Sequence, residues 1–174
     1  LNNQPMGFYA PAVLVKDAQR HGLRVKPIDI QISEWQCTVE HEADGTRSVR
    51  LGLGYVKGLK KINAELLVAS REQEGFYQST EDVIHRVSSL SRREQIRLAQ
   101  VGALNRLDGV RHRRDALWQV ERAGKLEGPL LSRNSELLRD ASETLPLKRM
   151  NVEERLVADY AGTGLTVGKH PMFY

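Results

Sequence analysis

The spacing of the apolar residues changes from about two to about 3.6 near residue 54, and no other feature limits the possible folds as strongly. From residue 33 to 53, apolar and polar residues alternate on both sides of Asp44-Gly45, a pair that favours a turn. We predict a β-hairpin here, with three inward-facing residues on each arm: Trp35, Cys37 and Val39, then Val49, Leu51 and Leu53. The apolar patterns that follow have the helical period. The predicted fold class is therefore mainly α with a small β-hairpin.

Two segments outside the middle of the chain also have helical signals. The first runs from Pro11 to Gly22, with proline at its entry and glycine after its end, and a short extended stretch over residues 23–30 follows it. The second begins at Asn151 with Glu154 three residues later, and we expect Gly162 to end it.

The middle of the chain is predicted to be a compact helical domain. A helix over about residues 60–71 places Ile62, Leu66 and Ala69 on one face and ends before Gly75. The next two helices begin at capping sequences, because a side-chain acceptor is followed three residues later by a carboxylate: Ser79 with Asp82, and Ser91 with Glu94. A further helix over residues 112–123 buries Ala116, Leu117 and Val120. Residues 125–149 lack a clear period and predict a linker.

Two segments between helices resemble the hairpins of helix-hairpin-helix motifs. Each has a glycine followed by an apolar residue, at Gly58-Leu59 and Gly102-Ala103-Leu104. Glycine lets the backbone approach a phosphate, and the amides at the start of the next helix point at it. Such contacts hold a duplex without reading its bases. The alternative for each hairpin is a plain turn with glycine as a helix cap. The candidate DNA-binding residues are Lys57, Gly58, Lys60, Lys61, Gly102, Asn105, Arg106, Arg111, Arg113 and Arg114.

The charge of the chain favours a polyanionic partner for this middle part. Residues 46–125 hold 16 of the 26 Lys and Arg but 9 of the 22 Asp and Glu, which gives a net charge of +7 against −3 for the remainder. The single Cys37 cannot form an internal disulfide, and no apolar run approaches the roughly 20 residues of a membrane span. We expect a cytoplasmic protein with no membrane partner.

Residues 1–39 resemble the end of the fingers region of bacterial error-prone DNA polymerases, C-family enzymes related to the polymerase III alpha subunit. The resemblance is carried by residues 3–9 (Asn-Gln-Pro-Met-Gly-Phe-Tyr), by Asp17-Ala18 and His21-Gly22, by residues 25–29, and by residues 33–39. Residues 164–172 resemble the segment that leads into an OB-type barrel, which we expect to be absent. The resemblance implies a fragment with the end of the fingers over residues 1–54, a tandem helix-hairpin-helix domain of the SAM-like helical kind over 55–124, and a linker and helix over 125–174.

The resemblance also implies where catalysis takes place. The parent enzyme would be a DNA-directed DNA polymerase that copies primer-template DNA, including damaged template, with Mg²⁺ bound by carboxylates that precede Leu1. No Asp-x-Asp pair occurs in this sequence. We therefore expect no catalytic residue, no metal site and no cofactor in this fragment, and no activity from it alone. Its partners would be double-stranded DNA and the rest of the polymerase, with a sliding clamp and translesion accessory proteins as further candidates. The alternative is a protein-interaction module that docks such factors.

Overall fold

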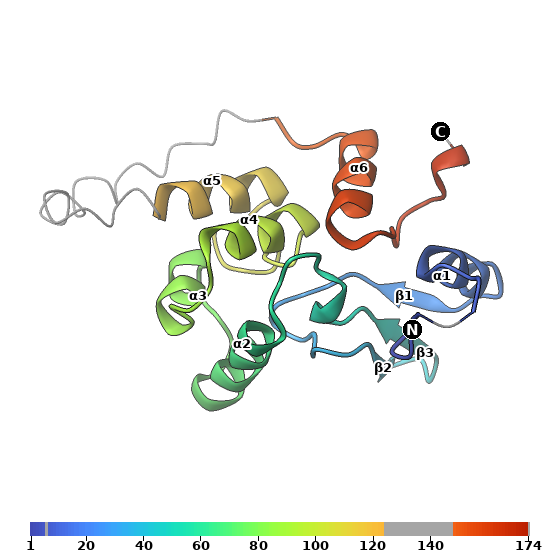
Figure 1. The fold of residues 1–174 in the computed structure, drawn as a ribbon, viewed down its shortest axis with the longest axis horizontal. Helices are drawn as coiled ribbons and strands as arrows, with labels where there is room; N and C mark the ends of the chain where they lie inside the picture. Colours follow the sequence, from blue (N-terminus) through green and yellow to red (C-terminus); the bar gives the residue numbers. More distant parts are fainter. Residues whose placement is uncertain (6, 124–147, 174) are drawn as a thin grey trace, which may run out of the picture.

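The structure is a computed structural model that describes residues 1–5, 7–123 and 148–173. Most of the predicted linker over residues 125–149 lies outside these ranges. Within them, a group of helices and a small sheet lie side by side (Figure 1). The helices are α1 (Pro11–Arg20), α2 (Lys61–Glu74), α3 (Thr80–Arg86), α4 (Arg92–Val101), α5 (Arg113–Ala123) and α6 (Val152–Thr163), with 3-10 turns at Leu53–Tyr55 and Pro171–Phe173. The fold is thus mainly helical, as predicted.

The sheet contains the predicted hairpin and one additional strand. Strands β2 (Thr38–His41) and β3 (Arg47–Arg50) are antiparallel, with Val39 opposite Val49, and Gly45 has a φ of +78° in the turn between them. Strand β1 (Arg24–Lys26) pairs with β3 in parallel, which places β3 in the middle. The extended stretch after α1 therefore joins the sheet.

The orientation of the hairpin residues differs in part from the prediction. Leu51 and Leu53 are buried, but Val39 is 59% exposed, and the buried positions of β3 are Ser48 and Arg50. Polar partners make this burial possible, because the Arg50 guanidinium pairs with Glu40 and donates to the Pro27 carbonyl oxygen at 3.0 Å. Hydrogen bonds from Arg50 and Lys26 favour the ionised form of Glu40 more strongly than burial opposes it. The pKa of Glu40 therefore falls to about 2. Ion pairs thus replace the expected apolar contacts on this face.

The buried face of α2 also differs from the prediction. Ile62 is 63% exposed and Leu66 is 43% exposed, whereas the buried residues are Asn63, Ala64, Leu67 and Ser70. The period was correct, but the interior face is displaced by one residue. Asn63 can be buried because its side-chain amide donates to the carboxylate of Glu94 at 2.9 Å.

The helix starts predicted from capping chemistry are confirmed. The side chains of Ser79, Ser91 and Asn151 accept hydrogen bonds from the backbone N–H groups three residues later, and the last two form complete capping boxes with Glu94 and Glu154. The expected end of α6 is wrong. Gly162 lies inside the helix, and Gly164, with a φ of +80°, is its cap.

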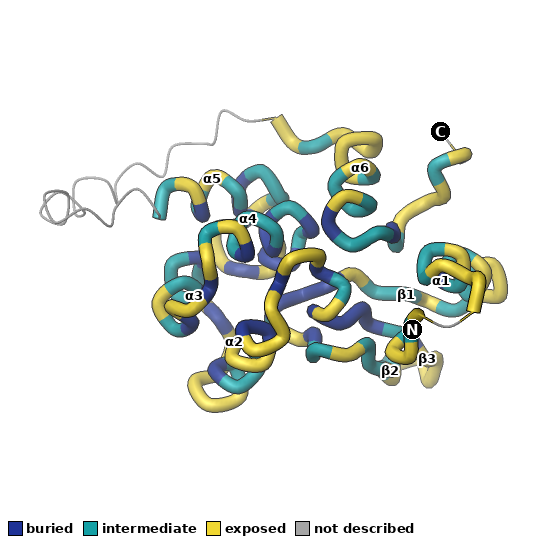
Figure 2. The backbone as a smooth tube through the Cα atoms, viewed as in Figure 1, coloured by how far each residue is buried: buried dark blue, intermediate teal, exposed yellow. Residues whose placement is uncertain are grey.

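One hydrophobic core connects the sheet and the helices. It contains Val15 of α1, Ile28 and Leu51 beside the sheet, Leu98 of α4, and Leu165 after α6. Figure 2 shows the buried positions gathered between the two parts. Residues from all three predicted ranges contribute to this core, and the boundaries between the ranges remain a proposal. None of the helices in the described ranges is long and apolar enough to cross a membrane.

Candidate nucleic-acid interface

The first hairpin joins the 3-10 turn Leu53–Tyr55 to α2 and presents an open glycine. Leu59 is buried and anchors the turn, whereas Gly58 is exposed with a φ of +86°. Apart from Gly58 and its two chain neighbours, no heavy atom of the described residues lies within 4 Å of the position that a Cβ of Gly58 would take. A phosphate group could therefore approach the backbone here.

The start of α2 is partly open to an anion. The Lys60 side chain makes no capping hydrogen bond, and no acidic residue lies in the first turn of α2. The Lys60 N–H itself donates to the buried Glu94 carboxylate at 2.9 Å. Lys60 and Lys61 are exposed, and Lys61 has only a loose contact with Glu65, at 3.6 Å. The free amides and partial positive charge of a helix start attract anions, and the two lysines add to this field.

The second hairpin differs, because neighbouring side chains cover its glycine. Gly102 has a φ of +83° and caps α4, with its N–H donating to the Ala99 carbonyl oxygen. A Cβ there would lie 2.6 Å from Arg113 Nε and 2.9 Å from Asn105 Nδ2. The start of α5 is also occupied, since the Asp115 carboxylate accepts from the Arg111 N–H at 3.0 Å. This hairpin has no open path to the glycine backbone like that at Gly58.

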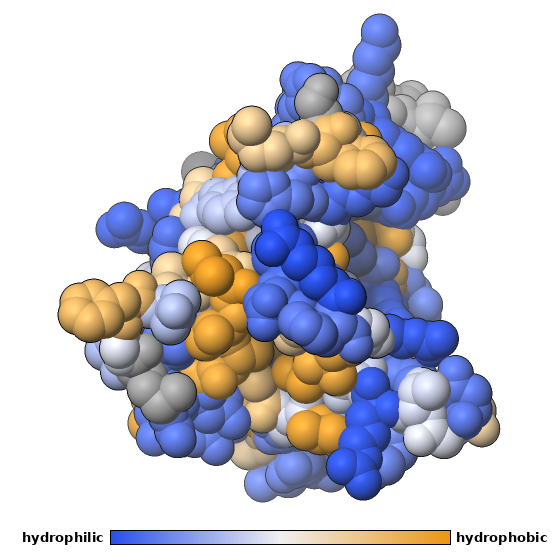
Figure 3. Space-filling view, turned by 90° about the vertical axis from the view of Figure 1, so that its right-hand side faces the viewer, coloured by the Kyte–Doolittle hydropathy of each residue, from blue (hydrophilic) through white to orange (hydrophobic). Residues whose placement is uncertain are grey.

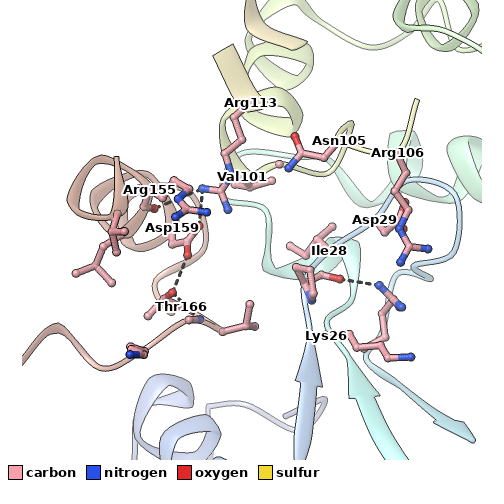
Figure 4. Close-up of a pocket in the computed structure, with 18 residues that line it drawn as sticks. Lys26, Ile28, Asp29, Val101, Asn105, Arg106, Arg113, Arg155, Asp159 and Thr166 are labelled. Atoms are coloured by element: carbon pink, nitrogen blue, oxygen red, sulfur yellow. Dashed lines mark hydrogen bonds and ion pairs between the residues drawn. The ribbon is translucent and has the colours of Figure 1, made fainter. Parts of the chain in front are cut away.

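Two predicted DNA-binding arginines of α5 hold α6 in place. Arg113 pairs with Asp159 at 2.6 Å, and their side chains are 13% and 16% exposed. Asp159 also accepts from the Thr166 hydroxyl at 2.7 Å, and Figure 4 shows this chain of contacts beside the second hairpin. Arg114 pairs with Glu154 at 2.7 Å and donates to the Lys148 carbonyl oxygen. Their main partners in the structure are thus carboxylates of α6.

The remaining candidates of the second hairpin are exposed. Asn105, Arg106 and Arg111 lie at the surface. Arg106 is 62% exposed, and its Nε lies 3.1 Å from Oδ2 of the buried Asp29. This contact is an ion pair without hydrogen-bond geometry, and Asp29 Oδ2 has no hydrogen-bond partner among the described residues.

The C-terminal end of α6 lies between the two hairpins. The Lys57 N–H donates to the Gly162 carbonyl oxygen at 2.8 Å, and the Lys57 ammonium donates to the Tyr160 carbonyl oxygen at 3.0 Å. On the other side, a Cβ on Gly162 would overlap Val101, which precedes Gly102. Both hairpins therefore flank Gly162. Lys57 contributes to this contact and is less available to DNA than Lys60 or Lys61.

Glu94 joins the two hairpin units directly. This carboxylate is 2% exposed and accepts from the N–H of Lys60, from the Asn63 amide, and from the N–H and hydroxyl of Ser91. Burial raises its pKa, but these hydrogen bonds outweigh burial and lower the pKa to about 2. An ionised Glu94 thus fixes the start of α2 against the start of α4.

Replacing Arg113 with leucine should lower the free energy of unfolding by about 2 kcal/mol, because Asp159 would lose its partner in a largely buried site. Chemical denaturation of the 174-residue chain measures this loss. Arg111→Leu is the matched control, since the Arg111 side chain has no ion pair within the described ranges. Equal stability of the two variants would contradict a structural role for Arg113.

The arrangement defines a class of protein. Two units, each with a glycine-apolar turn before a helix, are linked by α3 and bonded through Glu94, which is the organisation of a tandem helix-hairpin-helix domain. A family model for the helix-hairpin-helix motif matches residues 22–116, and the chain belongs to this family.

Relatives that match almost the whole chain confirm the predicted resemblance to error-prone DNA polymerases. The chain is 42% identical over 172 residues to the error-prone DNA polymerase of Alkalilimnicola ehrlichii, which is 99% of this chain. It is 41% identical to the enzymes of the same name from Brucella melitensis, over 177 residues, and Azoarcus, over 178 residues. The chain spans 16% of the length of each of these relatives.

Sequence reasoning missed the contacts that distinguish the two hairpins. It identified Glu94 as a helix cap but not as an acceptor for Lys60, 34 residues away. It did not identify Asp159 as the partner of Arg113. The only available signal was the glycine at position 162, which allows α6 to approach Val101. Within the described ranges, no group of three or more His, Cys, Asp or Glu side chains could hold a metal ion.

Proposed function

We propose that this chain is a DNA-binding segment of an error-prone DNA polymerase, and that its first hairpin holds a phosphate of duplex DNA without reading the sequence. The observation that carries this proposal is the open backbone at Gly58 beside the two exposed lysines at the start of α2. Lys60 and Lys61 supply charge around it, and Asn105, Arg106 and Arg111 offer further contacts from the second hairpin. In this proposal, Gly102, Arg113 and Arg114 have structural roles. Lys57 has two roles, because it contacts α6 and also adds positive charge beside Gly58.

The whole protein would extend a primer in the cytoplasm, including opposite damaged template, with Mg²⁺ bound in a part of the polymerase outside this chain. The likeness to error-prone polymerases supports this role. Figure 3 shows apolar side chains gathered on the face that bears α1 and the C-terminal segment. Exposed apolar side chains such as Phe8, Tyr9 and Phe173 would be covered by the rest of the polymerase. The purified 174-residue chain with Mg²⁺, primer-template and nucleotides should give no extension, and robust extension would contradict the proposal.

Changing Lys60 and Lys61 together to glutamine should weaken binding to a random duplex about tenfold at low salt. Each phosphate contact contributes about 0.9 to the slope of log affinity against log salt, so the slope should fall by about 1.8. Fluorescence anisotropy across a salt series, from about 50 to 200 mM, measures both quantities. With about five contacts in all, the unaltered chain should lose affinity several hundred-fold over that range.

The matched control is the pair Arg20→Gln and Arg24→Gln, which removes the same charge from the end of α1 and the start of β1, away from α2 (Figure 1). Equal effects of the two pairs would mean that net charge, not the hairpin, determines affinity. Unchanged DNA binding by the Lys60/Lys61 variant, with loss of binding to a clamp or accessory protein, would favour the protein-interaction module instead.

A further inference from the structure

A cleft of about 430 Å³ separates the second hairpin and the loop after β1 from α6 and the segment that follows it. Figure 4 shows side chains from these elements facing one another across it. Its walls include the apolar side chains of Ile28, Val101, Leu156 and Val167. A volume of this size, with apolar walls and a few polar groups, is typical of sites for small organic groups.

The cleft is cationic at its mouth. Six basic and two acidic side chains line it. Lys26 and Arg50 are paired with glutamates of β2 and its following residues, and Arg113 is paired with Asp159. Arg155 and Lys169 are exposed, and neither has an ion pair within the described residues. The Lys169 ammonium lies 3.7 Å from the centre of the Phe173 ring. These two cations can bind an anion.

A buried carboxylate oxygen without a hydrogen bond lies on the opposite side. Asp29 is 4% exposed, and its Oδ1 accepts from the Gln31 N–H. Its Oδ2 is buried and has no hydrogen-bond partner, and its one charged neighbour among the described residues is the Arg106 Nε at 3.1 Å. Because the Arg106 side chain is 62% exposed, a ligand that replaces this ion pair would leave Arg106 in solvent. A buried acceptor of this kind favours a ligand that brings an N–H group.

We propose that this cleft takes up one nucleotide of a single-stranded DNA segment. The phosphates would contact Arg155 and Lys169, with Arg106 turning toward them. The base would enter between the apolar walls and offer an N–H group to Asp29. A paired base inside a duplex could not enter such a cleft, because its edge is occupied and its faces are stacked. This site is separate from the phosphate contact proposed at Gly58.

Replacing Arg155 and Lys169 together with glutamine tests the proposal on the 174-residue chain. Fluorescence anisotropy would compare a blunt duplex with the same duplex carrying a six-nucleotide overhang at the 3′ or the 5′ end. We expect the unaltered chain to prefer one overhang over the blunt duplex by about tenfold, and the variant to lose that preference while it binds the blunt duplex as before. The Lys60/Lys61 variant should weaken binding to both and keep the preference.

A third DNA, whose overhang lacks bases, separates a nucleotide site from a simple cationic surface. The preference should fall to that of the blunt duplex if bases enter the cleft. An equal preference for the overhang without bases would overturn the proposal in favour of phosphate attraction alone. No preference for any overhang, or a preference that survives in the Arg155/Lys169 variant, would also overturn it. Because blunt-duplex binding is measured in the same series, failure of this proposal is distinct from failure of the first hairpin.

Discussion

Replacing Glu94 with alanine should lower the free energy of unfolding by about 4 kcal/mol, among the largest effects expected for a single change in this chain. Its carboxylate is almost fully buried and accepts hydrogen bonds from Lys60, Asn63 and Ser91. Alanine would leave these donors unsatisfied in the interior, at the junction of the two hairpin units. Urea denaturation of the variant and of the unaltered chain gives the difference.

Two further variants separate the charge of Glu94 from its shape. Glu153→Ala removes an exposed carboxylate at the start of α6 and should change stability by less than about 0.5 kcal/mol. Glu94→Gln keeps the shape but presents an amide N–H₂ group to donors, so an intermediate loss is expected. A Glu94→Ala chain as stable as Glu153→Ala would show that the network contributes nothing.

The low pKa of Glu94 also predicts a dependence of stability on pH. Its folded-state pKa is about 2, below the value of 4.5 expected when it is exposed. The stabilisation is therefore complete above pH 4.5 and is lost as the pH falls toward 2. Glu94→Gln should reduce this dependence in the acid range. Glu40, whose pKa is also about 2, contributes the same acid dependence to the unaltered chain and to the Glu94→Gln variant. Identical acid unfolding profiles for these two chains would contradict a low pKa of Glu94.

Replacing Gly52 with alanine should lower the free energy of unfolding by about 3 kcal/mol, because the new Cβ would overlap backbone atoms. It would contact Gln36 C and the Trp35 carbonyl oxygen and lie 2.6 Å from the Gln36 carbonyl oxygen. These atoms cannot move easily, because two hydrogen bonds fix the neighbouring backbone. The Leu53 N–H donates to the Glu34 carbonyl oxygen at 2.8 Å, and the Gly54 N–H donates to the Trp35 carbonyl oxygen at 2.9 Å.

The matched control for Gly52 is Gly168→Ala. At Gly168 the nearest atom to a new Cβ is the Thr166 hydroxyl oxygen at 3.4 Å, and the backbone conformation suits other residues. Thermal and urea unfolding should therefore show little change for Gly168→Ala and a large loss for Gly52→Ala. A Gly52→Ala chain within about 1 kcal/mol of the unaltered chain would mean that the two backbone segments can separate at little cost.

The sequence was most informative where a structure depends on residues close along the chain. The helix starts at Ser79, Ser91 and Asn151 follow from side chains that bond amides three residues away, and all three are present. The face of α2 was assigned wrongly because apolar Ile62 and Leu66 outweighed Asn63 in the pattern. Partners that are remote in the sequence, Glu94 and Ser89, make the burial of Asn63 favourable. The same limit applied to Arg50, whose partner Glu40 lies on the neighbouring strand.

By itself, the sequence determined the helical middle, its two glycine-apolar turns and the resemblance to error-prone polymerases, because these depend on local chemistry and on residue identity. It predicted both hairpins as candidates for phosphate binding. Only the tertiary structure decided how their surroundings differ. Gly58 stays open, whereas Arg113 covers Gly102 and pairs with Asp159, 46 positions further along the chain. Which arginines remain available for the proposed DNA contacts depends on where α6 packs, and no pattern of neighbouring residues encodes that contact.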